Sequence, residues 1–194
     1  MAPGATVFGW DSFDDLAEMA ASASLGPGVG VTLSNHSYSQ LKGWRNYPAD
    51  RAVTGPSGRF GWHWSGPGFN LGECTLFSLY AADAAATDDL CALLPHYLPF
   101  RSAGNERTDG PPADGQFWII QGGQWTQLNY IPASHPPGDG AAGNGLGWDT
   151  MSSEASAKNV IAVGAYDPAT RAMAPFSSYG PADDGRIKPD LVAP

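Results

Sequence analysis

The feature that most constrains the fold is a strand–helix–strand alternation at the start of the chain. Residues 5–10 (ATVFGW) predict a short strand, and Ser12 followed by Asp15 has the spacing of a capping box at a helix start. Apolar residues then recur at helical spacing as far as Gly26, which predicts the helix end. Residues 29–33 predict a second, buried strand. Such a crossover implies a parallel sheet that binds ligands at the carboxyl ends of its strands.

Three later runs predict further strands, at residues 97–103, 160–165 and 191–193. Pro99 lies inside the first of these runs and would remove a ladder hydrogen bond, so we expect that strand to be bulged or shorter. Residues 76–85 predict a helical segment, and Thr87 is positioned to cap a second short turn that runs through Leu94.

Two segments rich in glycine and proline separate these elements. Residues 43–70 and 106–157 have no clear period, and only one apolar run, residues 117–120, interrupts the second segment. We interpret both as loop excursions from a single domain that spans residues 1–194. Trp62 and Trp64 in the first excursion are consistent with an aromatic platform for substrate or carbohydrate, but packing of the excursion onto the sheet is favoured.

The net charge of the chain excludes some classes of binding partner. It has 10 basic and 19 acidic side chains, a net charge of −9, which repels nucleic-acid phosphates and anionic membranes. Nucleic acid is therefore not expected as a partner. No apolar run approaches the roughly 20 residues that span a bilayer, and no signal peptide is recognisable. Either the protein is cytosolic, or Met1 is not its natural start and an export signal lies upstream.

The two cysteines are too few for a disulfide framework and lack the spacing of a metal site. If Cys74 and Cys91 shared one continuous helix, they would lie about 25 Å apart, too far to bond. Both are predicted to be small core residues.

Three segments together resemble the subtilisin-like serine peptidases, or subtilases: residues 102–106 (SAGNE), 157–167 (AKNVIAVGAYD) and 176–194 (FSSYGPADDGRIKPDLVAP). The run SNHSYS at residues 34–39 resembles a bacterial subgroup of this family. The resemblance implies an α/β fold, three-layer α/β/α with a mainly parallel sheet, of which this chain is an internal part, incomplete at both ends.

The resemblance implies a serine-type endopeptidase, but the triad motifs of the family are missing from the sequence. We find no Asp-Ser/Thr-Gly strand end, no His-Gly-Thr-His and no Gly-Thr-Ser-Met. Residues 55–59 (GPSGR) lack the strand-to-helix context of a nucleophile elbow. Structural or loop roles are expected for the four histidines, His36, His63, His96 and His135. The chain alone is therefore predicted not to cleave peptides. By family, the complete protein is expected outside the cell or in the cell envelope.

Asn105 is the one catalytic residue that the resemblance assigns. In subtilases the asparagine of Ala-Gly-Asn donates its side-chain amide to the oxyanion of the transition state. Considered alone, an asparagine after a glycine at a strand end is more often a turn residue.

Two further segments are implied to bind a polypeptide substrate. Ser37, Tyr38 and Ser39 correspond to the family segment whose backbone pairs with substrate as an added strand and walls the specificity pocket. Ala103 and Gly104 correspond to the opposite wall. A polar loop after a strand is the simpler interpretation of residues 37–39, and Ser39 replaces the glycine that is common at its position.

No cofactor is required for such chemistry. Many subtilases carry structural calcium, and one acidic group in the sequence is a candidate for it: Asp109, Asp114, Asp139 and Asp149. Their spacing matches no calcium loop, so the metal sites remain unknown.

Three hypotheses follow. The chain is part of an endopeptidase whose flanking sequence supplies the triad, a non-catalytic degenerate module that keeps a peptide-binding groove, or an unrelated α/β enzyme. Because a partial sheet exposes apolar surface, we expect the isolated chain to be marginally stable and prone to aggregate.

Overall fold

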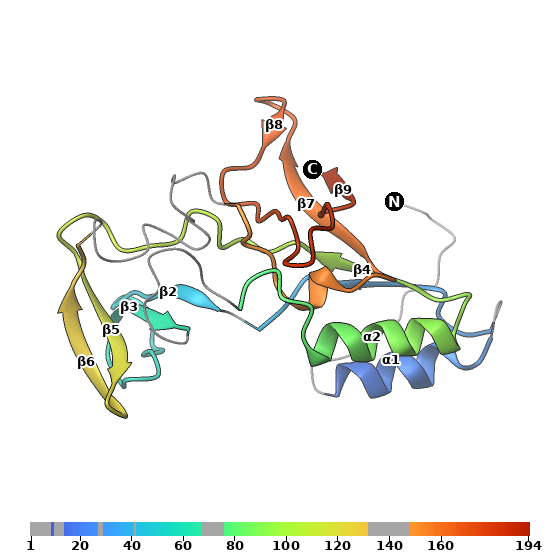
Figure 1. The fold of residues 1–194 in the computed structure, drawn as a ribbon, viewed down its shortest axis with the longest axis horizontal. Coiled ribbons are helices and arrows are strands. Elements are labelled where there is room, and N and C mark those ends of the chain that lie inside the picture. The colour runs from blue at the N-terminus through green and yellow to red at the C-terminus, as the bar shows by residue number, and fades with distance from the viewer. Residues whose placement is uncertain (1–8, 10–13, 27–28, 41, 67–75, 132–147) are drawn as a thin grey trace.

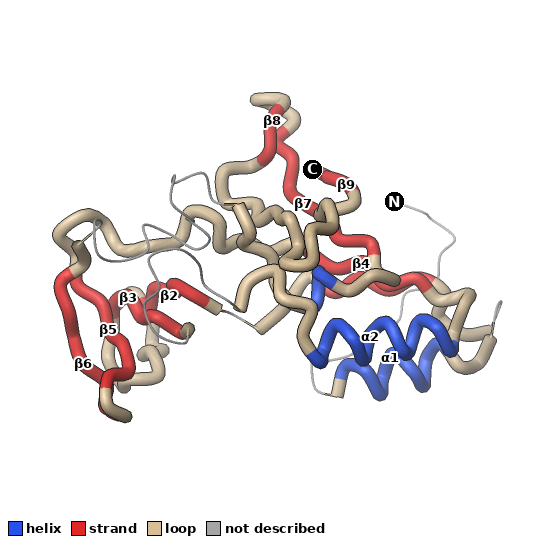
Figure 2. The backbone as a smooth tube through the Cα atoms, viewed as in Figure 1, coloured by secondary structure: helices blue, strands red, loops and turns tan. Residues whose placement is uncertain are grey.

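The structure, a computed structural model, describes residues 9, 14–26, 29–40, 42–66, 76–131 and 148–194. Its strands form two separate sheets, which lie side by side along the long axis of the molecule (Figure 1, Figure 2). Within this described part, no helix is long and apolar enough to cross a membrane. The predicted strand at residues 5–10 lies outside the described residues except for Gly9.

The first sheet is mostly parallel. Its strands are β1 (Leu33–His36), β4 (Leu98–Ser102), β7 (Ile161–Asp167), β8 (Ala172–Met173) and β9 (Leu191–Ala193). Strand β4 lies between β1 and β7, and β9 runs parallel to β7 on its other side. Only β8 is antiparallel, as a hairpin partner of β7. The predicted α/β class with a mainly parallel sheet is confirmed, while a mixed sheet was not expected.

Pro99 lies within β4 and costs no ladder bond. The amide of Leu98 donates to Thr32 beside β1, and the amide of Ala103 donates to Val163 of β7. Amides alternate in direction along a strand, so the nitrogen of Pro99 faces the β7 side. Pairing with β7 begins only at Phe100. The strand is therefore neither bulged nor interrupted at the proline.

Helices α1 (Asp15–Ala23) and α2 (Ala82–Leu93) pack against each other on one side of the first sheet (Figure 1). They share a buried cluster of Met19, Ala23, Cys91 and Tyr97. Cys91 is a buried free thiol, as predicted, whereas Cys74 lies outside the described residues. A helical layer on the opposite face is not present in the described part of the chain, so the three-layer arrangement stays a prediction.

Several predicted boundaries were wrong. The expected helix over residues 76–85 begins only at Ala82 and continues without a break through Thr87, whose hydroxyl donates to the Asp83 carbonyl instead of capping a turn. Ser78 ahead of it has φ of 50°, which no helix allows. An α-helix is continuous there because Ala84, Thr87, Asp88 and Cys91 are buried at helical spacing.

The first crossover also differs from its prediction. The strand expected at residues 29–33 lies at Leu33–His36. Its bounds are set by hydrogen bonding with β4 and not by the apolar character of the residues. The side chain of Asp15, expected in a capping box, instead accepts a hydrogen bond from Arg101 of β4. Ser12 lies outside the described residues. The helix ends at Ala23 with Ser24 as its C-cap, before Gly26, which was predicted to end it and has φ of 82°.

The two excursions predicted as loops together form the second sheet. It contains β2 (Gly43–Tyr47), β3 (Gly61–Ser65), β5 (Gln116–Gln121) and β6 (Gln124–Asn129), in that order. Strand β3 from the first excursion pairs in parallel with β5 from the second. The expectation of irregular structure was therefore wrong for these four strands.

Aromatic side chains form the core of the second sheet. Trp44, Trp64 and Phe117 are almost fully buried, and the ring of Trp44 lies 4.9 Å from that of Trp64 and 5.0 Å from that of Phe117. Trp62 packs at the edge of this cluster, and Phe77 joins it from the segment before α2. The tryptophans thus have a packing role, as favoured, but in a core of their own rather than on the first sheet.

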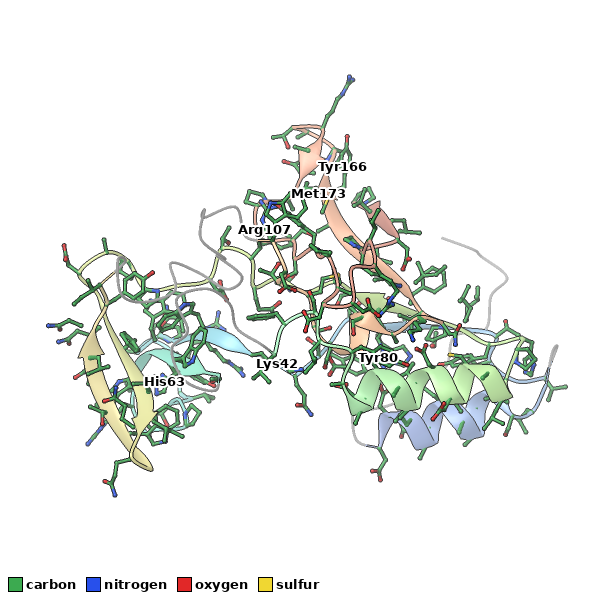
Figure 3. The ribbon with its side chains drawn as sticks, viewed as in Figure 1. Lys42, His63, Tyr80, Arg107, Tyr166 and Met173 are labelled. Carbon is green, nitrogen blue, oxygen red and sulfur yellow. The ribbon has the colours of Figure 1, made fainter. Side chains whose placement is uncertain are left out.

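The two sheets meet at a polar junction around Lys42 (Figure 3). Its ammonium group donates to the hydroxyl of Ser153, 2.7 Å away, and that hydroxyl donates to Asp83 at the start of α2. Ser153 precedes the short 3-10 helix η1 (Glu154–Ser156). Lys42, which directly precedes β2, is thus linked by hydrogen bonds to the start of α2 beside the first sheet.

Phe117→Ala is expected to destabilise the protein by about 3–5 kcal/mol, because it removes a fully buried ring from the second core. The matched control is Ile120→Ala on the same strand, where the side chain is 57% exposed and the loss should stay below about 1 kcal/mol. Urea unfolding followed by tryptophan fluorescence measures both. Equal losses would show that the second sheet has no such core.

Candidate functional site

The carboxyl ends of β1 and β4 bring the predicted site residues to one edge of the first sheet. His36, the last residue of β1, is in register with Arg101, one residue before the end of β4. Residues 37–39 and 103–105 follow directly on these neighbouring strands. The structure therefore brings together the two segments that the sequence assigns to substrate.

The two segments differ in their backbone hydrogen bonds. The Ala103 amide donates to Val163, its carbonyl accepts from Ser152, and the Gly104 carbonyl accepts from Ser178. In the described part of the chain, no backbone hydrogen bond involves residues 37–39. Residues 103–104 thus form a fixed wall, whereas residues 37–39 retain amides and carbonyls that an extended peptide can pair with.

Asn105 lies on a tight turn after β4. Gly104 has φ of 119°, which favours glycine, and a Cβ there would lie 2.5 Å from the Glu106 carboxylate. The backbone amide of Asn105 donates to Glu106 Oε2 at 2.6 Å. The Asn105 side chain is exposed, and its amide makes no hydrogen bond within the described residues. The backbone of Asn105 is therefore held while its side-chain donor stays available.

Glu106 is the residue that sequence reasoning missed. It is only 8% exposed, and its own amide donates to the hydroxyl of Ser178 at 3.2 Å. Burial raises the pKa of Glu106 above its usual range, although hydrogen bonds from the Asn105 and Glu106 amides act in the opposite direction. A glutamate in a polar, glycine-rich turn gives no sequence signal of burial.

Tyr38 is anchored by a partly buried polar network. Its hydroxyl donates to Asp15 of α1 and lies 2.7 Å from His36 Nδ1. Arg101 of β4, 4% exposed, donates to the other Asp15 oxygen at 2.8 Å. Burial acts to raise the pKa of Asp15, but the hydrogen bond from Tyr38 and the charge of Arg101 hold that pKa below its usual value. The network ties residue 38 to helix α1.

Ser34, His36 and Asp15 follow the atom order of a catalytic triad, but their contacts indicate a structural role. Ser34 Oγ lies 2.7 Å from His36 Nε2 and also bonds to the Tyr97 hydroxyl. Asp15 contacts His36 Nδ1 only at 3.3 Å, with the Tyr38 hydroxyl closer. Burial and the charge of Arg101 lower the pKa of His36, which makes it a weaker base.

The other described histidines also make hydrogen bonds within the fold. His63 is fully buried in the second sheet (Figure 3), with Nε2 2.6 Å from Ser57 Oγ and Nδ1 3.0 Å from the Gly61 carbonyl. Ser57 lies on the loop between β2 and β3, so residues 55–59 lack a nucleophile elbow. His96 lies 3.0 Å from the Ala23 carbonyl. His135 lies outside the described residues.

A cavity of about 590 Å³ adjoins the segment with unpaired backbone. Tyr38 and Ser39 form one side of it, and α1, α2 and Glu154 form the others. Ser34 and His36 are not among its lining residues. The space therefore lies beside the predicted substrate segment, and two of its lining residues, Asp15 and Tyr38, contact His36.

The described residues contain no group of three or more His, Cys, Asp or Glu side chains that could hold a metal ion. Of the predicted acidic group, Asp139 lies outside the described residues, and Asp114 and Asp149 occupy positions with positive φ. Burial, with the nearby negative charge of Glu106, raises the pKa of Asp109 to about 6. Calcium binding stays a prediction.

Asp109→Asn is expected to stabilise the fold at pH 7–8 by about 1–2 kcal/mol, discounted for the half-exposed position of Asp109. Its folded pKa of about 6 exceeds the unfolded value of 3.8, so its stabilising contribution is present near pH 4 and lost as the pH rises through 6. Urea unfolding at several pH values measures this. A constant difference between variant and parent would contradict it.

Comparison with known proteins identifies the family of the chain. No curated protein matched the chain. The sequence profile of the subtilase family, the peptidase family S8, matches residues 31–194. This match includes β1, β4, β7 and β9 and both segments at the sheet edge. Because it covers most of the sequence, the chain belongs to the subtilase family.

Proposed function

We propose that this chain is the substrate-binding part of a serine-type endopeptidase, which hydrolyses polypeptides through an acyl-enzyme. The observation that carries the proposal is the pairing of two features at one sheet edge. Residues 37–39 have backbone groups that pair with no other described backbone group, and one strand away Asn105 presents an exposed side-chain amide on a fixed turn. Peptide capture and oxyanion stabilisation need these two features side by side.

Asn105 acts as an oxyanion donor in this proposal. When a nucleophile attacks the scissile carbonyl, the carbonyl oxygen gains negative charge, and a donor held in place stabilises that charge without reorganising. The backbone of Asn105 is held by the Glu106 carboxylate, so its side-chain donor is already in place. Its interaction strengthens only as charge develops, so it acts on the rate of the chemical step.

Residues 37–39 bind the substrate backbone as an added strand, and Ala103 with Gly104 forms the opposite wall. Ser39 carries a Cβ where a glycine is common in the family, which brings a side chain close to the substrate backbone. The triad serine, histidine and aspartate are supplied by sequence flanking this chain. The complete protein acts outside the cell or in the cell envelope, and structural calcium remains possible in it.

Sequencing the coding DNA on both sides of this segment tests the proposal. A His-Gly-Thr-His motif upstream and a Gly-Thr-Ser motif downstream, both in frame, would support an active peptidase. An in-frame stop after Pro194 would overturn it in favour of a non-catalytic module that binds peptides.

Asn105→Ala in the triad-containing protein is expected to lower kcat by about 10²–10³-fold with little change in KM, because only the transition state loses a donor. This magnitude is that of subtilisin itself and is carried over from it. Steady-state hydrolysis of a peptide substrate measures the change. An unaltered kcat would remove Asn105 from the catalytic machinery.

Ser39→Pro is expected to raise KM about tenfold, because proline removes an amide that pairs with the substrate. Ser39→Ala keeps that amide and serves as the matched control, with KM expected near the parent value. If both variants behave alike in the same assay, the backbone of residue 39 does not pair with substrate.

A further inference from the structure

The turn that carries Asn105 is fixed by a buried carboxylate on the adjacent residue. Glu106 Oε2 accepts the Asn105 amide at 2.6 Å and lies against the Cα of Gly104, where a Cβ would be 2.5 Å away. The carboxylate of Glu106 thus occupies the inside of the turn. Since the Asn105 amide is engaged there, the turn leaves the Asn105 side chain outside.

Ser178 locks this arrangement from the other side. Its hydroxyl accepts the Glu106 amide at 3.2 Å and lies 3.4 Å from Glu106 Oε2, while its own amide donates to the Gly104 carbonyl at 3.0 Å. Next to it, Arg107 donates to the Pro175 carbonyl and lies over the ring of Tyr179 (Figure 3). The turn is therefore held to residues 175–179, a segment far away in sequence.

We propose that Glu106 is a positioning residue for Asn105: its carboxylate fixes the backbone of residue 105, so that the side-chain amide is held ready for the oxyanion. This inference rests on the proposed function. In this inference Glu106 acts through the residue before it, whose backbone amide its carboxylate accepts.

The charge on Glu106 makes this positioning depend on pH. An ionised carboxylate accepts an amide more strongly than a protonated one. The negative charge of Glu154 opposes the ionisation of Glu106, and the charge of Glu106 in turn raises the pKa of Asp109. Activity is therefore expected to fall as the pH drops through the raised pKa of Glu106. That raised pKa means that protonation of Glu106 does not itself destabilise the fold.

A double-mutant cycle in the triad-containing protein tests the inference, with Glu106→Ala, Asn105→Ala and the pair. Glu106→Ala alone is expected to lower kcat about tenfold with KM unchanged. In the Asn105→Ala background it should change kcat less than twofold, because the donor it positions is gone. An equal loss in both backgrounds would overturn the inference. An unaltered kcat in Asn105→Ala itself would instead overturn the proposed oxyanion role.

Glu106→Gln keeps the shape and an acceptor oxygen, and it provides a second measurement if the alanine variant fails to fold. It should keep kcat within about threefold of the parent at pH 8, while the acid limb that belongs to Glu106 disappears from the pH profile of kcat. Asp114→Asn, an exposed carboxylate-to-amide change on the same β4–β5 connection, is the control and should keep that limb. An acid limb unchanged in Glu106→Gln would overturn the inference.

Discussion

Parallel backbone pairing of β4 with β1 and β7 is the interaction on which the rest of the structure depends. It places the carboxyl ends of β1 and β4 next to each other, so residues 37–39 and 103–105 share one sheet edge. Pro99 is tolerated in this central strand because its missing amide faces the stretch where β7 has not yet begun to pair. The site therefore follows from strand register rather than from any single side chain.

Buried charge then fixes the segments that leave this edge. Asp15, Arg101 and Tyr38 connect α1, β4 and the predicted substrate segment, and Glu106 holds the turn of Asn105 against residues 175–179. Breaking one partner of such a buried pair leaves an unpaired charge, which costs several kcal/mol. Glu106 thus fixes the backbone of Asn105, whereas Asp15 fixes the side chain of Tyr38.

The second sheet shows where periodicity in the sequence fails. Its strands contain runs such as GWHWS and QWTQLN, in which tryptophan and glutamine mask a simple apolar alternation. Trp62 of β3 pairs with Phe117 of β5, and these residues come from two different excursions. A stretch of sequence that covers one excursion contains only one of the two paired strands. The loop prediction was wrong because the stabilising contacts of these strands are non-local.

The sequence by itself determined the family, the α/β class, strands β7 and β9 and the order of the site segments, because these depend on short contiguous motifs and local periodicity. The roles of Asn105 and residues 37–39 stay predictions. Only the tertiary structure decided three features: residues 37–39 form no backbone hydrogen bond with the described residues, the excursions form one aromatic core, and the Glu106 carboxylate accepts the Asn105 amide. Each of these depends on contacts between distant segments, and burial of a polar residue such as Glu106 is a property of the whole fold.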